Sequence, residues 1–347
     1  MNTEELKKGI EACDLALYIS GVAEELRQNK KFPAVHAYLS TLHSFARFSG
    51  EGGMPLPMDE VFTAKRLKEY QDWLLRRKLS QNTVSSYLST LRAVYNRWMP
   101  AGTPGHNPKL FGGMHIKVVS RTKRALTLPQ ISLLVADACT DARRTPNARP
   151  SLTDEQQTVL AYFLLMFMLR GMPFIDLAHL RKSDYRPKEA AISYSRHKTG
   201  KPMLVDIPPE AMALLLRCRD KTDSPYLFPI LDADVQNAAQ LYRCYRDALR
   251  RFNRTLMQLM SLLLPGIKVS SYTARHTWAT LAYHRGIPVG IISQALGHSS
   301  IQVTMNYLKP FDNKILDKVN RQVIADAKRY KKKKDEVHCV LRGRGLE

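Results

Sequence analysis

The chain reads SYTARHTWAT at residues 271–280 and ALGHSSIQVTMNYL at residues 295–308, the two most informative stretches of the sequence. They set Arg275, His298 and Tyr307 in a fixed order. A guanidinium can bind two phosphate oxygens at once, and an imidazole can donate a further hydrogen bond. A phenol is a nucleophile that keeps its product covalently attached. The combination favours chemistry at a phosphodiester.

The composition points to a polyanionic partner. The protein has 347 residues, a length that favours two domains with a core each. Lysine and arginine number 53 against 31 aspartate and glutamate residues, so the formal net charge is +22. Nucleic acid is the commonest large polyanion. A charge that only keeps the protein soluble is the alternative that composition leaves open.

The sequence offers little for a metal, a cofactor or a membrane. Five widely spaced cysteines without a CxxC pair argue against disulfides or zinc and fit a reducing, cytoplasmic location. There is no P-loop or dinucleotide fingerprint, so we expect no cofactor and no metal. The N-terminus lacks the apolar core of a signal peptide. The longest apolar run, 161–169, is far shorter than the ~20 residues of a membrane span.

Residues 1–105 are predicted to form a helical domain, and residues 106–125 a linker. Within the first domain, one apolar stripe recurs at four- and three-residue spacing over residues 82–99, which predicts an amphipathic helix ended by Pro100. The linker is predicted from its richness in glycine and proline. The stripe consists of Val84, Leu88, Leu91, Tyr95 and Trp98.

Two basic groups in this part of the chain are candidates for contact with DNA phosphates. Arg76, Arg77 and Lys78 follow a predicted helix, and Lys123 and Arg124 lie at the far end of the predicted linker. Lysine and arginine at such positions supply sequence-independent affinity for the DNA backbone. A solvated helix end explains the first group equally well.

Residues 126–328 are predicted to form a second domain, mainly α-helical with one small β-sheet. Thr153 and Gln156 make a T-x-x-Q capping box at the start of a helix that ends or kinks near Pro173. Residues 329–347 read as a basic, disordered tail. The predicted strands span 190–195 and 203–207, and further helices are predicted near 208–219, 233–262, 271–285, 288–296 and 313–328.

The stretch ARHTWAT, the turn LGHSS and a tyrosine nine residues after His298 together resemble the tyrosine recombinase (phage integrase) family. The ordered combination is specific, whereas any single piece is weak. Residues 32–99 are similar to the family's core-binding domain, and residues 126–310 to its catalytic domain. The resemblance implies a mainly α-helical, DNA breaking-and-rejoining fold of two domains that clamp duplex DNA like a C.

The resemblance also assigns roles, residue by residue. Arg275 matches the second catalytic arginine, which clamps the scissile phosphate, and Tyr307 matches the nucleophile. His298 matches a hydrogen-bond donor to that phosphate. Lys198, in RHKTGK, matches the lysine that protonates the leaving 5′-oxygen. Asp176 matches the acidic residue that braces the site.

Two positions depart from the family pattern. Pro173 stands where the first arginine is usual, and Tyr272 stands where histidine is common. We hypothesise that Arg170, three residues before Pro173 on the same helical face, reaches the phosphate instead. The alternative is that Arg170 only stabilises a helix end. The phenol of Tyr272 can donate to a phosphate but does not titrate near neutral pH.

The remaining candidates have ordinary explanations beside the functional one. His276 is assigned to packing that supports the site. His197 and Lys201 either touch DNA or lie in an exposed turn. The predicted helix at 313–328 either docks on a neighbouring copy of the chain or packs against its own domain.

The resemblance implies a site-specific recombinase that forms a 3′-phosphotyrosine, exchanges strands through a Holliday junction, and works as a homotetramer on double-stranded recombination sites. The expected outcome is integration, excision or inversion, and the short segment before residue 32 favours simple inversion or resolution. Two alternatives stay open. One is topoisomerase IB-like relaxation of DNA, and the other is a DNA-binding relative without catalysis.

Overall fold

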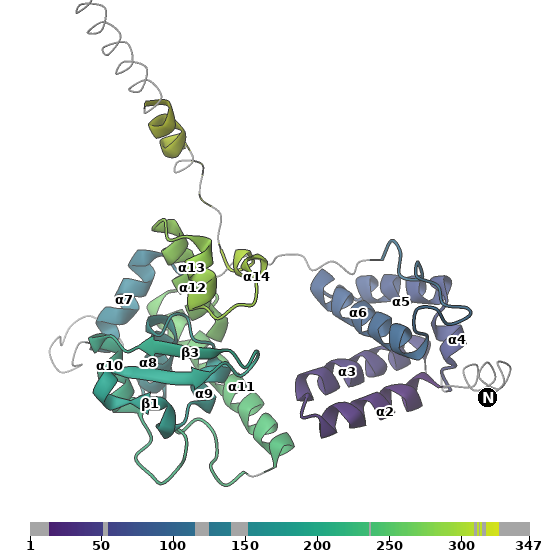
Figure 1. Cartoon of the computed structure of the whole chain (residues 1–347), viewed down its shortest axis with the longest axis horizontal. Coiled ribbons are helices and arrows are strands. Elements are labelled where there is room, and N and C mark those ends of the chain that lie inside the picture. Colours follow the sequence, from purple (N-terminus) through teal and green to yellow (C-terminus); the bar gives the residue numbers. More distant parts are fainter. Residues whose placement is uncertain are drawn as a thin grey trace, which may run out of the picture. The chain divides into compact units, whose positions relative to one another are not determined.

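The computed structural model divides the chain into two compact units, each described here by itself. The first comprises Met1–Thr122 and Ile230–Ala248, and the second comprises Lys123–Pro229 and Leu249–Glu347. The fold is mainly α-helical with one small sheet, as predicted (Figure 1). The residues that the structure describes are 14–50, 55–114, 125–139, 152–235, 237–308, 311, 313 and 317–325.

The first unit is a bundle of amphipathic helices around an aromatic core. Phe45 and Tyr70 are fully buried, with ring centroids 4.8 Å apart, and the Tyr70 hydroxyl donates to Ser44. The predicted stripe helix is confirmed as α6, which begins after the N-cap Ser80. Five helices make up this bundle in the described residues 14–50 and 55–114: α2 (Leu15–Gln28), α3 (Phe32–Ser49), α4 (Met58–Val61), α5 (Ala64–Arg76) and α6 (Gln81–Trp98).

The first unit extends beyond residue 105, where the linker was predicted to begin. Leu110 and Phe111 are buried in the core of the first unit, and the backbone N–H of Asn107 donates to the Tyr95 hydroxyl at 2.6 Å. Burial of two large apolar side chains holds this stretch against the bundle, because their transfer from water is favourable. Glycine and proline content therefore misplaced the boundary. The basic candidates Lys123 and Arg124 lie outside the described residues.

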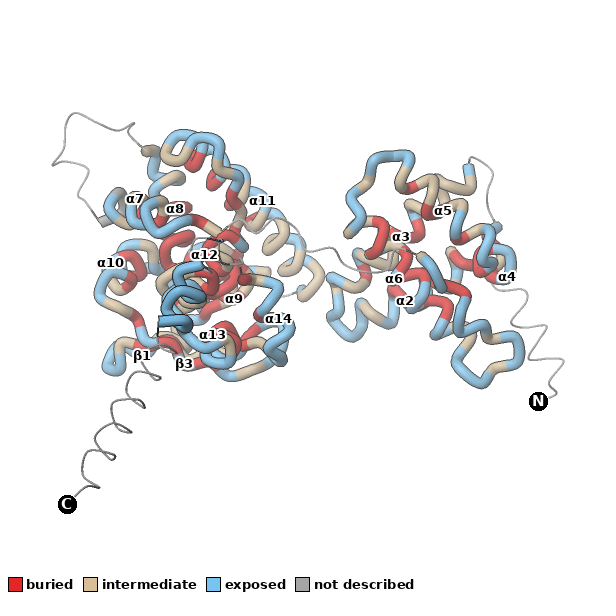
Figure 2. Tube along the Cα trace, turned by 90° about the horizontal axis from the view of Figure 1, so that it is seen from above, coloured by how far each residue is buried: buried red, intermediate tan, exposed pale blue. Residues whose placement is uncertain are grey.

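The second unit surrounds α8, whose residues 159–166 are all buried. The predicted capping box is confirmed, since the side chains of Thr153 and Gln156 each bond the other's backbone N–H. Helix α8 packs against α7, α10 and α12, which bury it beyond its first, polar turn (Figure 2). The helices of this unit include α7 (Leu128–Cys139), α8 (Asp154–Met168), α9 (Phe174–His179), α10 (Pro209–Cys218), α12 (Ser271–His284), α13 (Val289–Ala295) and α14 (Ile301–Met305). Helix α11 (Ala238–Leu263) is divided between the two units, and its part from Leu249 onward belongs to this one.

The sheet is antiparallel in the order β1-β2-β3, with strands Tyr185–Arg186, Ala191–Ser195 and Pro202–Asp206. Strands β2 and β3 confirm the two predicted strands and form a hairpin in which Ser195 pairs with Pro202. The backbone N–H of Arg196 closes the hairpin by donating to Lys201 O at 2.9 Å. The basic tip is therefore held on a rigid arm.

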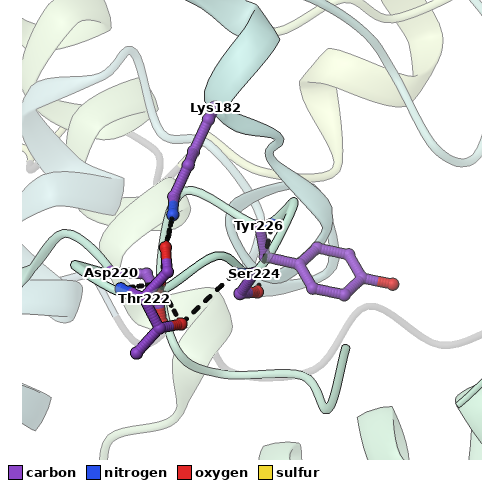
Figure 3. Close-up of polar contacts among 5 residues, drawn as sticks. All are labelled: Lys182, Asp220, Thr222, Ser224 and Tyr226. Carbon is purple, nitrogen blue, oxygen red and sulfur yellow. Dashed lines mark hydrogen bonds and ion pairs between the residues drawn. The ribbon is translucent and has the colours of Figure 1, made fainter. Parts of the chain in front are cut away.

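A loop after α10 is tied back to the segment that leads into this sheet (Figure 3). Lys182 Nζ donates to the Asp220 carboxylate at 3.2 Å and to Thr222 O, and the Asp220 carboxylate also accepts from the Thr222 N–H and hydroxyl. The backbone N–H of Lys182 donates to Pro225 O, and that of Leu227 donates to Leu180 O. These bonds fix the entry to β1.

Residues 317–325 are helical, within the predicted helix 313–328, and every one of them is exposed. Val319, Val323 and Ile324 are its exposed apolar side chains. In the described part of the chain, no helix combines the length and apolar character required to cross a bilayer.

Candidate active site around Arg275

Arg275 lies in the middle of α12 and is buried, with 2% of its surface exposed. Its Nη1 donates to Gly171 O at 2.8 Å and its Nη2 to Leu296 O at 2.6 Å. Gly171 has φ of 67°, and a Cβ there would stand 3.1 Å from the Arg275 Cα. Glycine is therefore needed at this turn, both for its conformation and for the close approach of α12.

His298 lies in the turn between α13 and α14 and bonds directly to the Arg275 guanidinium. The distance from Arg275 Nη2 to His298 Nε2 is 2.8 Å, and that from His298 Nδ1 to Thr304 Oγ1 is also 2.8 Å. Because arginine has no acceptor, Nε2 must accept and the ring proton must sit on Nδ1. Burial, followed by the positive charge of Arg275, lowers the pKa of His298 to about 4. The ring is therefore neutral at pH 7.

Tyr307 follows α14, and its ring packs beside both of these groups. The Arg275 guanidinium carbon is 5.4 Å from the ring centroid, and the His298 ring centroid is 4.9 Å away. The His276 ring packs against the Tyr307 ring at a tilt, with the centroids 4.8 Å apart, and its Nδ1 donates to the Tyr307 carbonyl oxygen at 3.3 Å. The structure thus brings together Tyr307, Arg275 and His298, and His276 supports the tyrosine by packing.

The hypothesis for Arg170 rested on a helical spacing that is wrong. Helix α8 ends at Met168, and Arg170 has a left-handed φ of 57°, so Arg170 and Pro173 do not share a helix face. The Arg170 guanidinium instead donates to Leu204 O at 3.2 Å and lies 3.6 Å from the Asp206 carboxylate. It is engaged on strand β3.

Arg196 lies beside the cluster, although its sequence context alone did not predict a place there. It is 7% exposed, its Nε lies 2.8 Å from Asp176 Oδ2, and its Nη1 donates to Leu296 O. The available signal was the sequence of β2, where Ile192 and Tyr194 alternate with serines, so that Arg196 falls on the face of the apolar residues. The run of basic residues around it suggested a uniformly exposed tip.

Asp176 holds the base of this hairpin tip. Its side chain is fully buried, and its Oδ1 accepts from the backbone N–H of His197 at 3.0 Å. Burial raises the pKa of the Asp176 carboxyl, while Arg196 acts in the opposite direction. Lys198 is exposed at the tip and Lys201 is half-buried. Both lower the pKa of His298, so their charges act on the cluster.

The other candidates lie at the edge of the cluster or apart from it. Tyr272 is exposed on α12; desolvation first, and then the Tyr307 phenol, raise its pKa. In the first unit, Arg76, Arg77 and Lys78 are exposed at the end of α5, and the Arg77 guanidinium lies 4.8 Å from the Trp73 ring centroid. The stacked guanidinium is consistent with a contact to DNA and with an ordinary helix end.

The arrangement suits an anion. Two buried guanidiniums face a single buried carboxylate, which leaves an uncompensated positive charge beside the tyrosine ring. Buried charge of this kind favours a negatively charged ligand. Among the residues that the structure describes, no group of three or more His, Cys, Asp or Glu side chains is placed to hold a metal ion.

Two family models match the chain. Residues 143–314 match the phage integrase family, and residues 14–109 match the phage integrase SAM-like domain. The first match includes every residue of the cluster, and the second covers most of the first unit.

Named relatives are distant in sequence. A tyrosine recombinase of Thermosipho africanus is 22% identical over 70% of this chain and 76% of its own length. The tyrosine recombinase XerA of Pyrococcus furiosus is 27% identical over 46% of this chain and 52% of its own length.

Solved structures share the fold. The Tn1549 transposon integrase in complex with a circular intermediate DNA superposes with a TM-score of 0.57 at 14% identity, covering 89% of this chain and 100% of that one. A lambda integrase dimer bound to a COC′ core site gives a TM-score of 0.57 at 14% identity, covering 89% of this chain and 82% of the other.

Proposed function

Because the chain belongs to the phage integrase family, we propose that it is a site-specific recombinase that cuts and rejoins DNA through a bond to Tyr307. The tyrosine recombinase enzyme class follows from the family. The position of Tyr307 supports it as the nucleophile. Its ring centroid lies 5.4 Å from the guanidinium carbon of the buried Arg275, which is also hydrogen-bonded to the neutral His298.

The proposed step is an in-line transfer at phosphorus. The Tyr307 oxygen forms a bond to the scissile phosphorus, its phenolic proton passes to solvent, and the bond from phosphorus to the 5′-oxygen breaks. The departing oxygen takes a proton, for which Lys198 at the hairpin tip is the candidate donor. One phosphodiester bond is replaced by another in the 3′-phosphotyrosine, so the bond energy is conserved and a 5′-hydroxyl can reverse the step without ATP. Reversal with the partner's 5′-hydroxyl exchanges strands and yields a Holliday junction.

Arg275 would neutralise the charge that develops on the phosphate oxygens. Its guanidinium is fixed by two carbonyl oxygens and one imidazole, so it needs no reorganisation when the substrate arrives. His298 holds Arg275 as an acceptor. For His298 to donate to the phosphate, its bond to Arg275 would have to break on DNA binding and a proton would have to move to Nε2, because here Nε2 is an acceptor and the ring proton on Nδ1 is bonded to Thr304.

The proposed partner is duplex DNA bearing a recombination site, and the proposed assembly is a homotetramer at work beside the cell's DNA in the cytoplasm. The net charge of +22 supports the first part. The exposed apolar side chains of helix 317–325 support a contact with another copy of the chain, since they are unburied within this one. Similar folds were solved as a lambda integrase dimer on a core site and as XerH bound to its difH substrate.

A covalent-trapping experiment tests the function. The full-length protein first selects bound sequences from random duplexes, and the selected DNA is then nicked near the cleavage position so that the freed end diffuses away. We expect a protein–DNA band that survives denaturant and is lost in Tyr307→Phe. Tyr283→Phe, a change in a second tyrosine of the same unit, should keep the band. Tight binding with no wild-type band would instead identify a DNA-binding protein without catalysis.

Plasmid assays separate recombination from topoisomerase activity. A recombinase should delete or invert the segment between two selected sites and should leave a single-site supercoiled plasmid largely supercoiled. Relaxation of single-site plasmids without any exchange product would favour the topoisomerase alternative.

A further inference from the structure

Arg196 is a buried cation that the proposed mechanism has not yet used. Its backbone is fixed under the hairpin tip, because its N–H donates to Lys201 O and its carbonyl oxygen accepts from the Gly200 N–H at 2.8 Å. A buried guanidinium is costly unless it is paired and hydrogen-bonded. The position of Arg196 therefore calls for a physical reason beyond packing.

Two segments far apart in the sequence surround the Arg196 side chain. Asp176 on α9 pairs with its Nε, and Leu296 O at the end of α13 accepts from its Nη1. Gly297, with φ of 66°, makes room for it, since a Cβ there would stand 3.2 Å from Nη1 and 3.3 Å from Cδ of Arg196. The side chain is thus directed inward from the hairpin, toward the turn that carries His298.

The guanidiniums of Arg196 and Arg275 lie next to one another, because both donate to the same oxygen, Leu296 O. Like charges held this close repel, and Arg196 follows burial as a cause of the lowered pKa of Arg275. Asp176 compensates only one of the two charges. A doubly negative group between the arginines would relieve the repulsion, and the phosphorane formed during phosphoryl transfer is such a group.

We propose that Arg196 is the second guanidinium that binds the scissile phosphate, in the place that the sequence analysis gave to Arg170. The assignment rests on the proposed function. Arg275 would bind the phosphate from α12 and Arg196 from the hairpin. A planar fork at each position can bind phosphate oxygens in two directions at once. Arg170 keeps its structural contacts on Leu204 and Asp206.

The first test compares cleavage of the nicked duplex by single variants. Arg196→Ala should form the covalent adduct about 10²–10³-fold more slowly than wild type, the usual effect of a missing transition-state donor. Arg186→Ala is the matched control, because Arg186 is an exposed arginine of the same sheet that pairs with Glu189. Arg186→Ala should cleave at the wild-type rate. A loss in Arg170→Ala that exceeds the loss in Arg196→Ala would overturn the proposal.

The second test separates charge neutralisation from folding. A duplex with a neutral methylphosphonate at the scissile position no longer requires the second positive charge. On this substrate the deficit of Arg196→Ala should shrink by at least about tenfold, which corresponds to one lost charge contact of roughly 1.4 kcal/mol. An unchanged deficit would mean that Arg196 acts only on structure and would overturn the proposal.

The double variant Asp176→Asn/Arg196→Met removes the ion pair as a unit, so no buried charge is left unpaired by the change. It should fold and bind the selected DNA but cleave as poorly as Arg196→Ala. Wild-type cleavage by this folded variant would refute the role of Arg196. Absence of any adduct from the wild-type protein would refute the proposed function itself, so the two failures are distinguishable.

Discussion

The two units bury different kinds of side chain. In the described part of the chain, the buried charged residues are Asp176, Arg196 and Arg275, and all three lie in the second unit. The core of the first unit is aromatic and aliphatic, and its buried polar groups are uncharged, such as Thr41 and Gln71. Both units are helical, so secondary structure does not explain the difference.

The difference shows where folding and chemistry compete. Burying apolar surface stabilises a core by about 25 cal/mol per Å², whereas burying an ion costs several kcal/mol before any partner offsets it. In its described residues, the first unit buries only apolar and uncharged polar side chains. The second retains an unbalanced charge beside Tyr307, which is a cost that a bound phosphate would recover.

The largest effect on stability is expected from removing the carboxylate of the second unit. Asp176→Ala should lower the free energy of unfolding by about 3–5 kcal/mol, because it leaves the buried Arg196 unpaired beside Arg275. Urea denaturation measures the loss. Asp176→Asn keeps an acceptor for the His197 N–H and should lose less. A change under about 1 kcal/mol in Asp176→Ala would mean that the ion pair does not hold this part of the molecule.

A change at an equally buried residue of the first unit should act on stability alone. Leu88 is fully buried in the apolar core, and Leu88→Ala should cost about 2–5 kcal/mol through lost burial and a residual cavity. Cleavage by the folded variant at saturating DNA should stay at the wild-type rate. Leu17→Ala, at a position 75% exposed, is the control and should leave stability unchanged. A slower chemical step in Leu88→Ala would contradict the idea that this core affects stability alone.

A smaller, pH-dependent effect is expected at His298. Its pKa is about 4 in the folded protein against 6.5 ordinarily, so the unfolded chain binds a proton first as the pH falls. The stability that His298 contributes is present above pH 6.5 and is lost as the pH falls toward 4. His298→Gln should reduce the drop in urea midpoint between pH 7 and pH 5. An equal drop in the variant would contradict a neutral, buried ring.

The smallest effect is expected on the surface of the first unit. If Arg77 contacts a phosphate, Arg77→Ala should make the slope of log affinity against log salt shallower by about 0.9, one released counterion. Arg27, which pairs with Glu24, is a matched exposed arginine whose loss should leave the slope unchanged. Equal slopes for Arg77→Ala and wild type would assign the basic run to a solvated helix end.

Local patterns predicted much of this molecule. The capping box at Thr153, the strands of the hairpin and the stripe of α6 are visible in the sequence because each depends on neighbours a few residues apart. The order of Arg275, His298 and Tyr307 in the sequence also predicted a common site, and the structure brings the three side chains together. The start of the linker could not be predicted in this way, because Leu110 and Phe111 are buried by helices distant in the sequence.

By itself, the amino-acid sequence determined the helical class, the basic character and the ordered motif that identified the family. Only the tertiary structure decided which guanidinium lies beside that of Arg275. The left-handed turn at Arg170 directs that side chain to β3. The partners of Arg196 come from two segments 120 residues apart, one containing Asp176 and the other Leu296. Long-range contacts of this kind leave no periodic trace in a sequence, because their geometry exists only after the elements have packed.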